Sequence, residues 1–339
     1  MNNMLSSLAF LVAAVCAGVM GFAIQRGATC TVAAVDEIVS KRTFRRLASL
    51  LEASIWVAGG LMLAQGLHLL PAMPTGYPLN RWTIVGGVLL GLGAFVNRAC
   101  VFGAIARLGS GQWAYLFTPL GFYLGCLSVG SVFALPQHQK LPGGSPVLQA
   151  PAWVAGVFLV FATWRLLRPL WGGAREPANQ SLADRLRDAL TRRIWSPHAA
   201  TTVIGIAFFF MLILVGAWAY TDVLAELARG MAASLVARVL LLLALLLGAV
   251  WGGVTAGLFR PTRMTIVQVA KCLGGGLLMG WGSLLIPGGN DGLILVGMPL
   301  LWPYAWAAFL AMCASIAAAQ ISFRSRRPMA RPVSGSPLW

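Results

Sequence analysis

Two cysteines stand beside arginines in apolar parts of the chain, where a thiol and a cation together suit the handling of an anion. Cys30 lies four residues after Arg26 in GFAIQRGATC, and Cys100 lies two residues after Arg98 in NRACVFG. A neutral thiol is a weak donor with a polarizable sulfur, so it favours loose contact with a soft anion. Because charge at membrane depth is expensive, an arginine there indicates function. We expect both thiols to be neutral contacts and both arginines to attract the anion.

Each of these residues also has a purely structural interpretation. Arg26 and Arg98 would only set topology if they lay at the cytoplasmic headgroups. Cys30 and Cys100 would be small packing residues, since a free cysteine behaves as a small hydrophobe. The six cysteines show neither a CxxC motif nor zinc spacing, so we predict no metal site and no cofactor.

Glycine-rich segments surround Cys100 and recur late in the chain. GGVLLGLGAFVNRACVFG (86–103) aligns without gaps with GGLLMGWGSLLIPGGNDG (275–292) at a constant offset of 189, which places Gly289 opposite Cys100. Five glycines coincide in this alignment. Duplication and a chance match of two glycine-rich segments both stay open. If duplicated and crossing in opposite directions, the two segments form an inverted repeat with a site between them.

The residues that end each glycine-rich run, 97–103 and 287–292, are predicted to be loops that dip into the membrane. Broken helices free backbone N–H groups, which are tolerated there only beside a cavity or inside protein. A helix restarting after such a loop points N–H groups at an anion. The predicted path residues are Arg26, Cys30, Asn97, Arg98, Cys100, Gly103, Gly288, Gly289 and Asn290.

The elements that must position these residues are membrane-spanning helices. The chain has 339 residues, of which 58% are hydrophobic and only 10% are charged, against about 25% charged in soluble domains. We therefore predict an all-α polytopic membrane protein with short re-entrant helices or loops, embedded in a lipid bilayer. Nine spans are predicted, at about 5–24, 47–70, 83–97, 113–135, 152–170, 200–220, 231–258, 272–287 and 293–322.

Basic residues explain the net charge of +16 without a nucleic-acid partner, because they lie in short loops between apolar runs. Loops such as 41–46 and 165–193 are rich in Lys and Arg, whereas 136–151 is nearly free of them. The positive-inside rule then predicts a periplasmic N-terminus and a cytoplasmic C-terminus. Three parts are expected: an N-terminal half (1–171), a cytoplasmic linker (172–196) with an amphipathic helix at 182–193, and a C-terminal half with a basic tail (197–339).

Three further residues invite specific predictions. Glu52 lies near the inner surface, where we expect it to pair with an arginine, and a role in proton coupling is open. Trp113 and Tyr115 are expected to be aromatic anchors at the membrane interface.

GFAIQRGATC, NRACVFGAIARLGSGQWAYL and GGGLLMGWGSLLIPGGNDG resemble the YeeE/YedE sulfur-transport family of bacterial inner-membrane proteins, over about residues 8–322. The resemblance implies uptake of thiosulfate or a related sulfur compound through an hourglass-shaped path, in which loop cysteines pass the ion by S–H hydrogen bonds. Cys30 and Cys100 match those positions. It also implies a soluble cytoplasmic sulfurtransferase as partner.

The chain departs from the family at one position. Thiosulfate-type members carry a third cysteine where this chain has Gly289, in GGNDG. We predict that the side-chain direction of Gly289 points into the path and that its lack of a side chain widens the exit. Asn290 or Asp291 is the candidate for a replacing polar contact.

The sequence thus favours a transporter of a small sulfur-containing anion and not an enzyme. Two other classes stay open. A membrane thiol–disulfide oxidoreductase would cycle Cys30 and Cys100 through a disulfide, although no CxxC is present. A non-transporting subunit that docks a soluble sulfurtransferase would keep the basic inner loops and would not need buried thiols.

Overall fold

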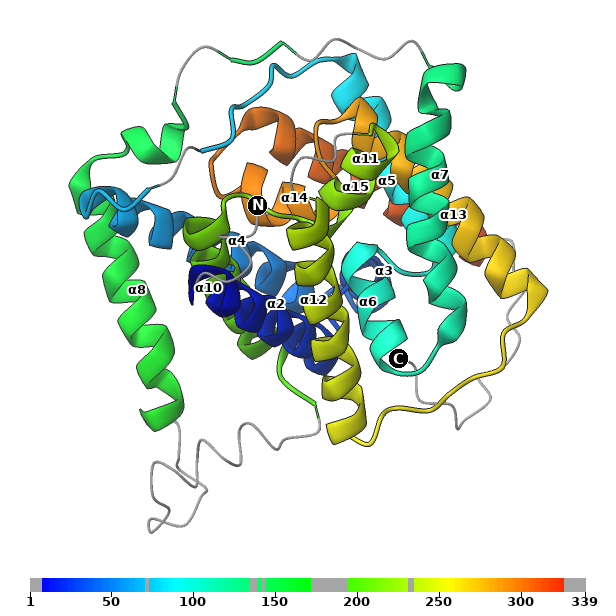
Figure 1. Ribbon diagram of the computed structural model, residues 1–339, viewed down its shortest axis with the longest axis horizontal. Coiled ribbons are helices and arrows are strands. Elements are labelled where there is room, and N and C mark those ends of the chain that lie inside the picture. Colours follow the sequence, from blue (N-terminus) through cyan, green and yellow to red (C-terminus); the bar gives the residue numbers. More distant parts are fainter. Residues whose placement is uncertain are drawn as a thin grey trace.

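The computed structural model describes residues 8–70, 73–133, 139–141, 144–171, 194–230 and 235–325, and within these ranges every regular element is a helix (Figure 1). Seven helices are long and apolar enough to cross a membrane, or eight if the bent pair formed by Ile266–Leu285 and Asn290–Gly297 is one span. The described part of the chain is therefore that of a multi-pass helical membrane protein, as the composition predicts.

The helices of the first half precede the linker and those of the second half follow it. The first half contains α2 (Leu8–Gly27), α3 (Thr31–Lys41), α4 (Arg45–Gly66), α5 (Arg81–Asn97), α6 (Val101–Gly109), η1 (Trp113–Leu116), α7 (Phe117–Val132), η2 (Pro146–Gln149) and α8 (Ala152–Trp171). The second half contains α10 (Pro197–Val215), α11 (Tyr220–Ala228), α12 (Leu235–Thr255), α13 (Ile266–Leu285), α14 (Asn290–Gly292), η3 (Leu293–Gly297) and α15 (Pro303–Ser325).

Nine predicted spans become seven or eight in the structure for two reasons. The apolar part of α8, Ala152–Leu167, is shorter than the spanning helices. The span predicted at 272–287 counts only together with Asn290–Gly297, relative to which it is bent by 52°. The span predicted at 293–322 is retained but begins later, at Pro303, after a positive φ of 57° at Leu301. A proline is favourable in the first turn of a helix and unfavourable inside one.

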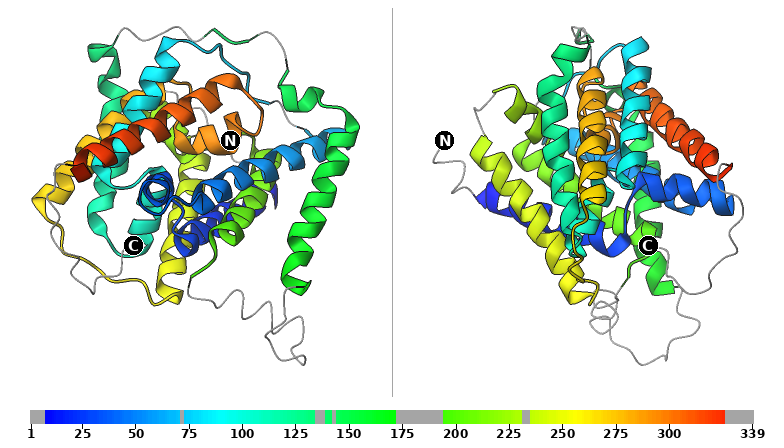
Figure 2. Two further views of the ribbon diagram at one scale, coloured as in Figure 1. Left: turned by 180° about the vertical axis from the view of Figure 1, so that it is seen from behind. Right: turned by 90° about the vertical axis from the view of Figure 1, so that its right-hand side faces the viewer.

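Helices from both halves pack against one another, so the halves are not separate bodies. Helix α13 lies between α5 and α7, and α2 packs against α10 and α12 (Figures 1 and 2). Helix α8 stands at the edge of the molecule and is held to α4 by the Trp56–Phe158 ring contact, with centroids 5.7 Å apart. The predicted helix at 182–193 lies outside the described residues.

Glycines let α5 and α13 approach until their backbones touch. A Cβ atom on Gly93 would lie 2.6 Å from the carbonyl oxygen of Gly275, and one on Gly282 would lie 2.6 Å from that of Gly86. Small residues serve this purpose in membrane proteins, where lipid competes equally for apolar side chains.

The same face-by-face packing joins each of these helices to a flanking neighbour. A Cβ atom on Gly91 of α5 would lie 2.5 Å from the Met312 carbonyl oxygen on α15. A Cβ atom on Gly280 of α13 would lie 3.0 Å from the Cys126 nitrogen on α7. Gly91 and Gly280 are counterparts at the offset of 189, and each faces the next long helix after the one that carries its counterpart. The internal repeat itself stays a prediction.

Candidate functional site

Three helices begin directly after breaks in the chain. Cys30 precedes α3, Cys100 precedes α6 and Gly289 precedes α14, each as the N-cap residue with an extended backbone. The breaks at 98–100 and 286–289 fall where the sequence predicts dipping loops. Three cap positions in different parts of the chain are thus available to form one site.

The first two breaks contact each other through their cysteines. The backbone N–H of Thr31, the residue after Cys30, donates to Cys100 Sγ at 3.2 Å. A Cβ atom on Gly103 would lie only 2.6 Å from Cys30 Sγ. Both cysteines are free, and Cys100 is fully buried. Gly103 is therefore glycine because the Cys30 thiol occupies its side-chain space.

Asn290 joins the third break to the first. Its side-chain amide donates to Thr31 Oγ1 at 3.4 Å, and the residue is fully buried. Among the described residues its Oδ1 oxygen has no hydrogen-bond partner. A buried acceptor without a donor is costly, so the oxygen is available to a ligand that carries one.

Gly289 and Cys100 have nearly the same backbone but different surroundings. Their φ and ψ angles are −79° and −179° for Gly289, and −74° and −177° for Cys100. The positive φ of this turn, 137°, belongs to Gly288. A Cβ atom on Gly289 would overlap Thr221 Oγ1 and lie 2.7 Å from Thr221 Cβ. The prediction of an open space at Gly289 is therefore wrong, because Thr221 of α11 fills it.

Asp291 holds Thr221 in that place. The Thr221 hydroxyl donates to Asp291 Oδ1, and its backbone N–H donates to Oδ2 at 3.2 Å. Asp291 is 3% exposed. It lines a small cavity together with Trp218, Tyr220 and apolar side chains of α2, α6 and α12.

The structure places the two predicted arginines in different surroundings. Arg26 is buried, donates to Thr255 Oγ1 at 2.8 Å and lies over the Phe22 ring, 4.9 Å from its centroid. Arg98 ends α5 with a positive φ of 59°, and its side chain is exposed. The role of both arginines as sources of field at the thiols stays a prediction.

Asn97 braces the second break. Its amide donates to the Ala99 carbonyl oxygen at 2.8 Å, and its Oδ1 accepts from the Thr118 hydroxyl at 3.0 Å. Both polar ends of the side chain are therefore used inside the protein. Asn97 fixes the loop that presents Cys100, and its position in the path stays a prediction.

Arg107 and Tyr115 form a second brace that the sequence analysis missed. The Arg107 guanidinium lies over the Tyr115 ring, 5.1 Å from its centroid, and donates to the Arg98 carbonyl oxygen at 3.3 Å. The Tyr115 hydroxyl donates to the Asn97 carbonyl oxygen at 3.2 Å. Arg107 lies in α6 and Tyr115 lies eight residues later in η1. Because the two residues are on different elements, helical periodicity in the sequence does not reveal their contact.

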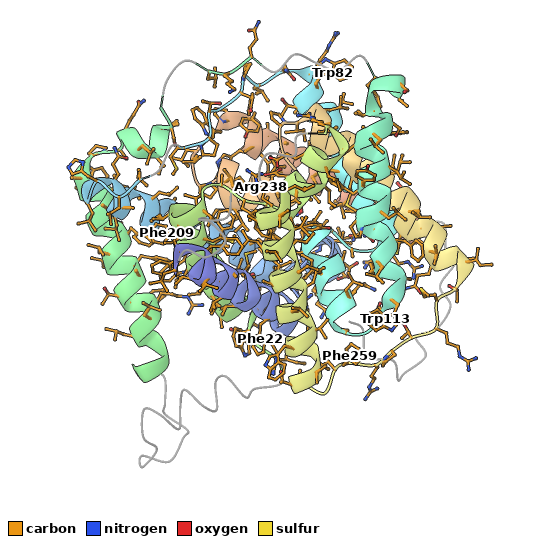
Figure 3. The ribbon with its side chains drawn as sticks, in the orientation of Figure 1. Phe22, Trp82, Trp113, Phe209, Arg238 and Phe259 are labelled. Atoms are coloured by element: carbon orange, nitrogen blue, oxygen red, sulfur yellow. The ribbon has the colours of Figure 1, made fainter. Side chains whose placement is uncertain are left out.

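The two predicted aromatic anchors differ. Tyr115 is 2% exposed, so the prediction is wrong for it. Trp113 is 37% exposed and packs on Phe259 with ring centroids 6.0 Å apart, at the end of the molecule opposite Trp82 (Figure 3).

Glu52 pairs with an arginine, as predicted. Its contacts among the described residues are with α8 and α10 and not with residues of the three breaks. Its Oε1 accepts from Arg165 at 2.6 Å and from the Thr202 hydroxyl at 3.1 Å, while Oε2 contacts His198 Nδ1. This cluster ties α4 to α8 and α10. The possible role of Glu52 in proton coupling stays untested.

Comparison with known proteins gives one positive finding. The family model described as sulphur transport matches residues 26–318, a range that contains all three breaks and their N-cap residues. No curated protein matches the chain.

Proposed function

The chain belongs to the sulphur transport family, and from that premise we propose that it takes up thiosulfate or a related small sulfur-containing anion across a bacterial inner membrane. The anion passes the place where the breaks before α3, α6 and α14 meet. A transporter fits the match better than an enzyme, since the family is one of transport proteins.

The observation that carries this proposal is the contact between the two cysteine breaks. Half-buried Cys30 and fully buried Cys100 cap the starts of α3 and α6, and the Thr31 N–H beside Cys30 donates to Cys100 Sγ. Backbone N–H groups at the start of a helix attract an anion. Neutral thiols add weak, polarizable contacts, and conduction requires binding that is loose enough for release. Cys30 and Cys100 would thus hold a soft anion one after the other and let it go.

Paired helices support an inverted repeat around this site. Gly86 and Gly282 meet across α5 and α13, and their counterparts Gly275 and Gly93 meet in the same way. An isologous contact of this kind, in which residue i meets j and j meets i, is what a two-fold relation produces. A transporter built so has its site at the midplane, between the halves.

The distribution of basic residues supports the proposed orientation in the membrane, and the charge of the anion supports a cytoplasmic partner. Basic residues at 41–46 and at the C-terminal end support a cytoplasmic face there. An inside-negative potential opposes anion uptake by ~2.3 kcal/mol per charge per 100 mV, so rapid consumption by a cytoplasmic sulfurtransferase would help to pull the anion inward.

Uptake by purified protein in vesicles tests the proposal. Radiolabelled thiosulfate should enter wild-type vesicles and empty vesicles should exclude it. Competition by unlabelled sulfite, sulfate, tetrathionate and selenite would then rank the substrates. Absence of uptake and of exchange for every sulfur anion in the panel would reject a transporter of this class.

A membrane thiol–disulfide oxidoreductase is the second candidate, because the two cysteine breaks meet: the Thr31 N–H donates to Cys100 Sγ, and Cys30 Sγ lies against Gly103 of α6. Such an enzyme cycles its cysteines through a disulfide, whereas a transporter keeps them reduced. Trapping of free thiols in cells during uptake separates the two. A Cys30–Cys100 disulfide that forms and disappears with turnover would favour the enzyme.

A further inference from the structure

A buried carboxylate lies in the protein beside the proposed anion path. Both oxygens of Asp291 accept hydrogen bonds from one neutral residue, Thr221. Among the described residues, no Lys or Arg forms an ion pair with Asp291, in contrast to Glu52, which Arg165 neutralises at 2.6 Å. An unpaired carboxylate at membrane depth is expensive, and its negative charge would repel an anion in the same low-dielectric space. Its presence calls for a functional explanation.

The cavity beside Asp291 has a donor that no described group uses. Trp218 lines this cavity with Asp291, is 2% exposed, and its indole N–H has no hydrogen-bond partner among the described residues. A buried N–H without an acceptor is costly, so it points to a ligand that accepts hydrogen bonds. The remaining walls are apolar, from residues such as Phe102 and Leu295. The cavity therefore suits one small acceptor group beside one acid.

A second acid, Asp222, lies near Asp291 on α11, a helix outside the candidate membrane-spanning helices. Oxygens of Asp222 lie 3.9 Å from the side-chain position of Gly292. Burial, the Asp291 charge and the Glu226 charge raise the pKa of Asp222 to about 7. Glu226 in turn pairs with Arg238 of α12 at 2.5 Å. The other ionisable groups near these two acids are Tyr220 of α11, Arg229 directly after it, Cys126 of α7 and Tyr304 of α15.

We propose that Asp291 binds the proton that accompanies the anion inward. This inference rests on the proposed uptake of a sulfur anion. Asp291 takes a proton from the outer side by way of Asp222, and the neutral acid no longer repels the anion. The anion and the proton then both leave to the inside, which restores the carboxylate. No bond of the anion breaks and no electron moves. Each proton cancels one charge that the membrane potential opposes.

The coupling is reciprocal, because whatever favours the protonated acid in the presence of the anion also favours the anion in the presence of the proton. Two observations must therefore occur together. Added anion should draw protons into vesicles, and an acid exterior should draw the anion in.

Vesicles with the membrane potential clamped at zero test this directly. A gradient of about one pH unit, acid outside, should drive about tenfold accumulation of radiolabelled thiosulfate for each coupled proton, since ~1.4 kcal/mol corresponds to a factor of ten. A pH dye inside the vesicles should show acidification when thiosulfate is added outside. Accumulation that ignores the gradient, without acidification, would overturn the proposal while leaving transport itself intact. If thiosulfate accumulates in response to a sodium gradient and not to the pH gradient, the coupling ion is sodium and the proposal is also overturned.

Asp291→Asn separates coupling from passage. Asparagine can accept the Thr221 N–H with its oxygen and donate to the Thr221 hydroxyl with its amide, so the local hydrogen bonds remain possible. We expect exchange of labelled for unlabelled thiosulfate to continue, while pH-driven accumulation falls from about tenfold to none. The matched control is Asp36→Asn, an exposed acid paired with Arg324 at 2.8 Å, which should accumulate like wild type. Tenfold accumulation by a well-folded Asp291→Asn variant would refute the assignment. If that variant does not fold, the wild-type dye measurement still decides.

Discussion

The breaks before α6 and α14 have the same backbone and differ in what fills the side-chain position of the cap residue. At the first, Cys100 carries its own thiol, which accepts from the Thr31 N–H. At the second, Gly289 has no side chain, and the Thr221 hydroxyl from α11 fills the space. The comparison shows that a polar group can be kept at a site although the residue that would carry it is absent, because a neighbouring helix supplies another.

Removal of the Cys100 thiol from the break before α6 should have the largest effect. We expect Cys100→Ala to lower thiosulfate uptake by about tenfold to a hundredfold, since a hydrogen bond to a charged group contributes ~1.5–3 kcal/mol. Uptake is measured beside the amount of folded protein in the membrane. Cys313→Ala, on α15 and only half-buried, is the matched control and should transport normally. Normal uptake by Cys100→Ala would mean that the two breaks do not differ in any way that matters for transport.

A cysteine placed at Gly289, in the break before α14, should destabilise the protein unless Thr221 is also replaced by a smaller residue. Gly289→Cys alone should lower the free energy of unfolding by ~1–3 kcal/mol, as overpacking does, because its Cβ atom overlaps Thr221. Adding Thr221→Ala should recover most of this loss, since the cysteine then has the space. Thermal melting in detergent measures both. A single variant as stable as wild type would show that the loop can move and that Thr221 does not define the site.

Counterpart glycines should respond alike if the two regions are copies. Gly91→Ala and Gly280→Ala each push a methyl group against the backbone of a flanking helix, and each should cost ~1–3 kcal/mol of stability. The control is Gly274→Ala, where no atom lies within 4 Å. That variant should be neutral, or more stable by up to ~1 kcal/mol through helix propensity. Tolerance at one counterpart and collapse at the other would break the correspondence.

The smallest expected effect concerns Asp222, an acidic residue on α11 near the break before α14. The pKa of Asp222 is raised to about 7, first by burial and then by the neighbouring acids. An unfolded chain releases the same proton near pH ~3.9. Between these values the unfolded state binds fewer protons, so stability falls as pH rises through the window. Melting temperatures between pH ~4 and ~7 should decline less steeply in Asp222→Asn than in wild type; parallel curves would contradict the shift.

Much of the site was predictable because its signals are local. Glycine runs that end in polar residues predicted the breaks, and the cysteines that cap α3 and α6 were identified from their context. Thr221 was not, since it contacts Asp291 from 70 positions away in a segment that resembles an outer loop. The exposure of Arg98 could not be predicted, because residue spacing does not reveal the left-handed turn that ends α5. The count of spans differed at α8, whose apolar part is too short, and at α13, which qualifies only together with the bent segment Asn290–Gly297.

The glycine faces of α5 also constrain how the protein is made. Their partners lie on α13 and α15, which the ribosome synthesises late, so a nascent chain inserts α5 long before anything can cover it. Glycine and lipid attract one another weakly, and close packing is what holds membrane helices together. The early half must therefore wait in the bilayer with its central helix unpartnered, and the protein should become compact and resistant to protease only after its last helix has been inserted.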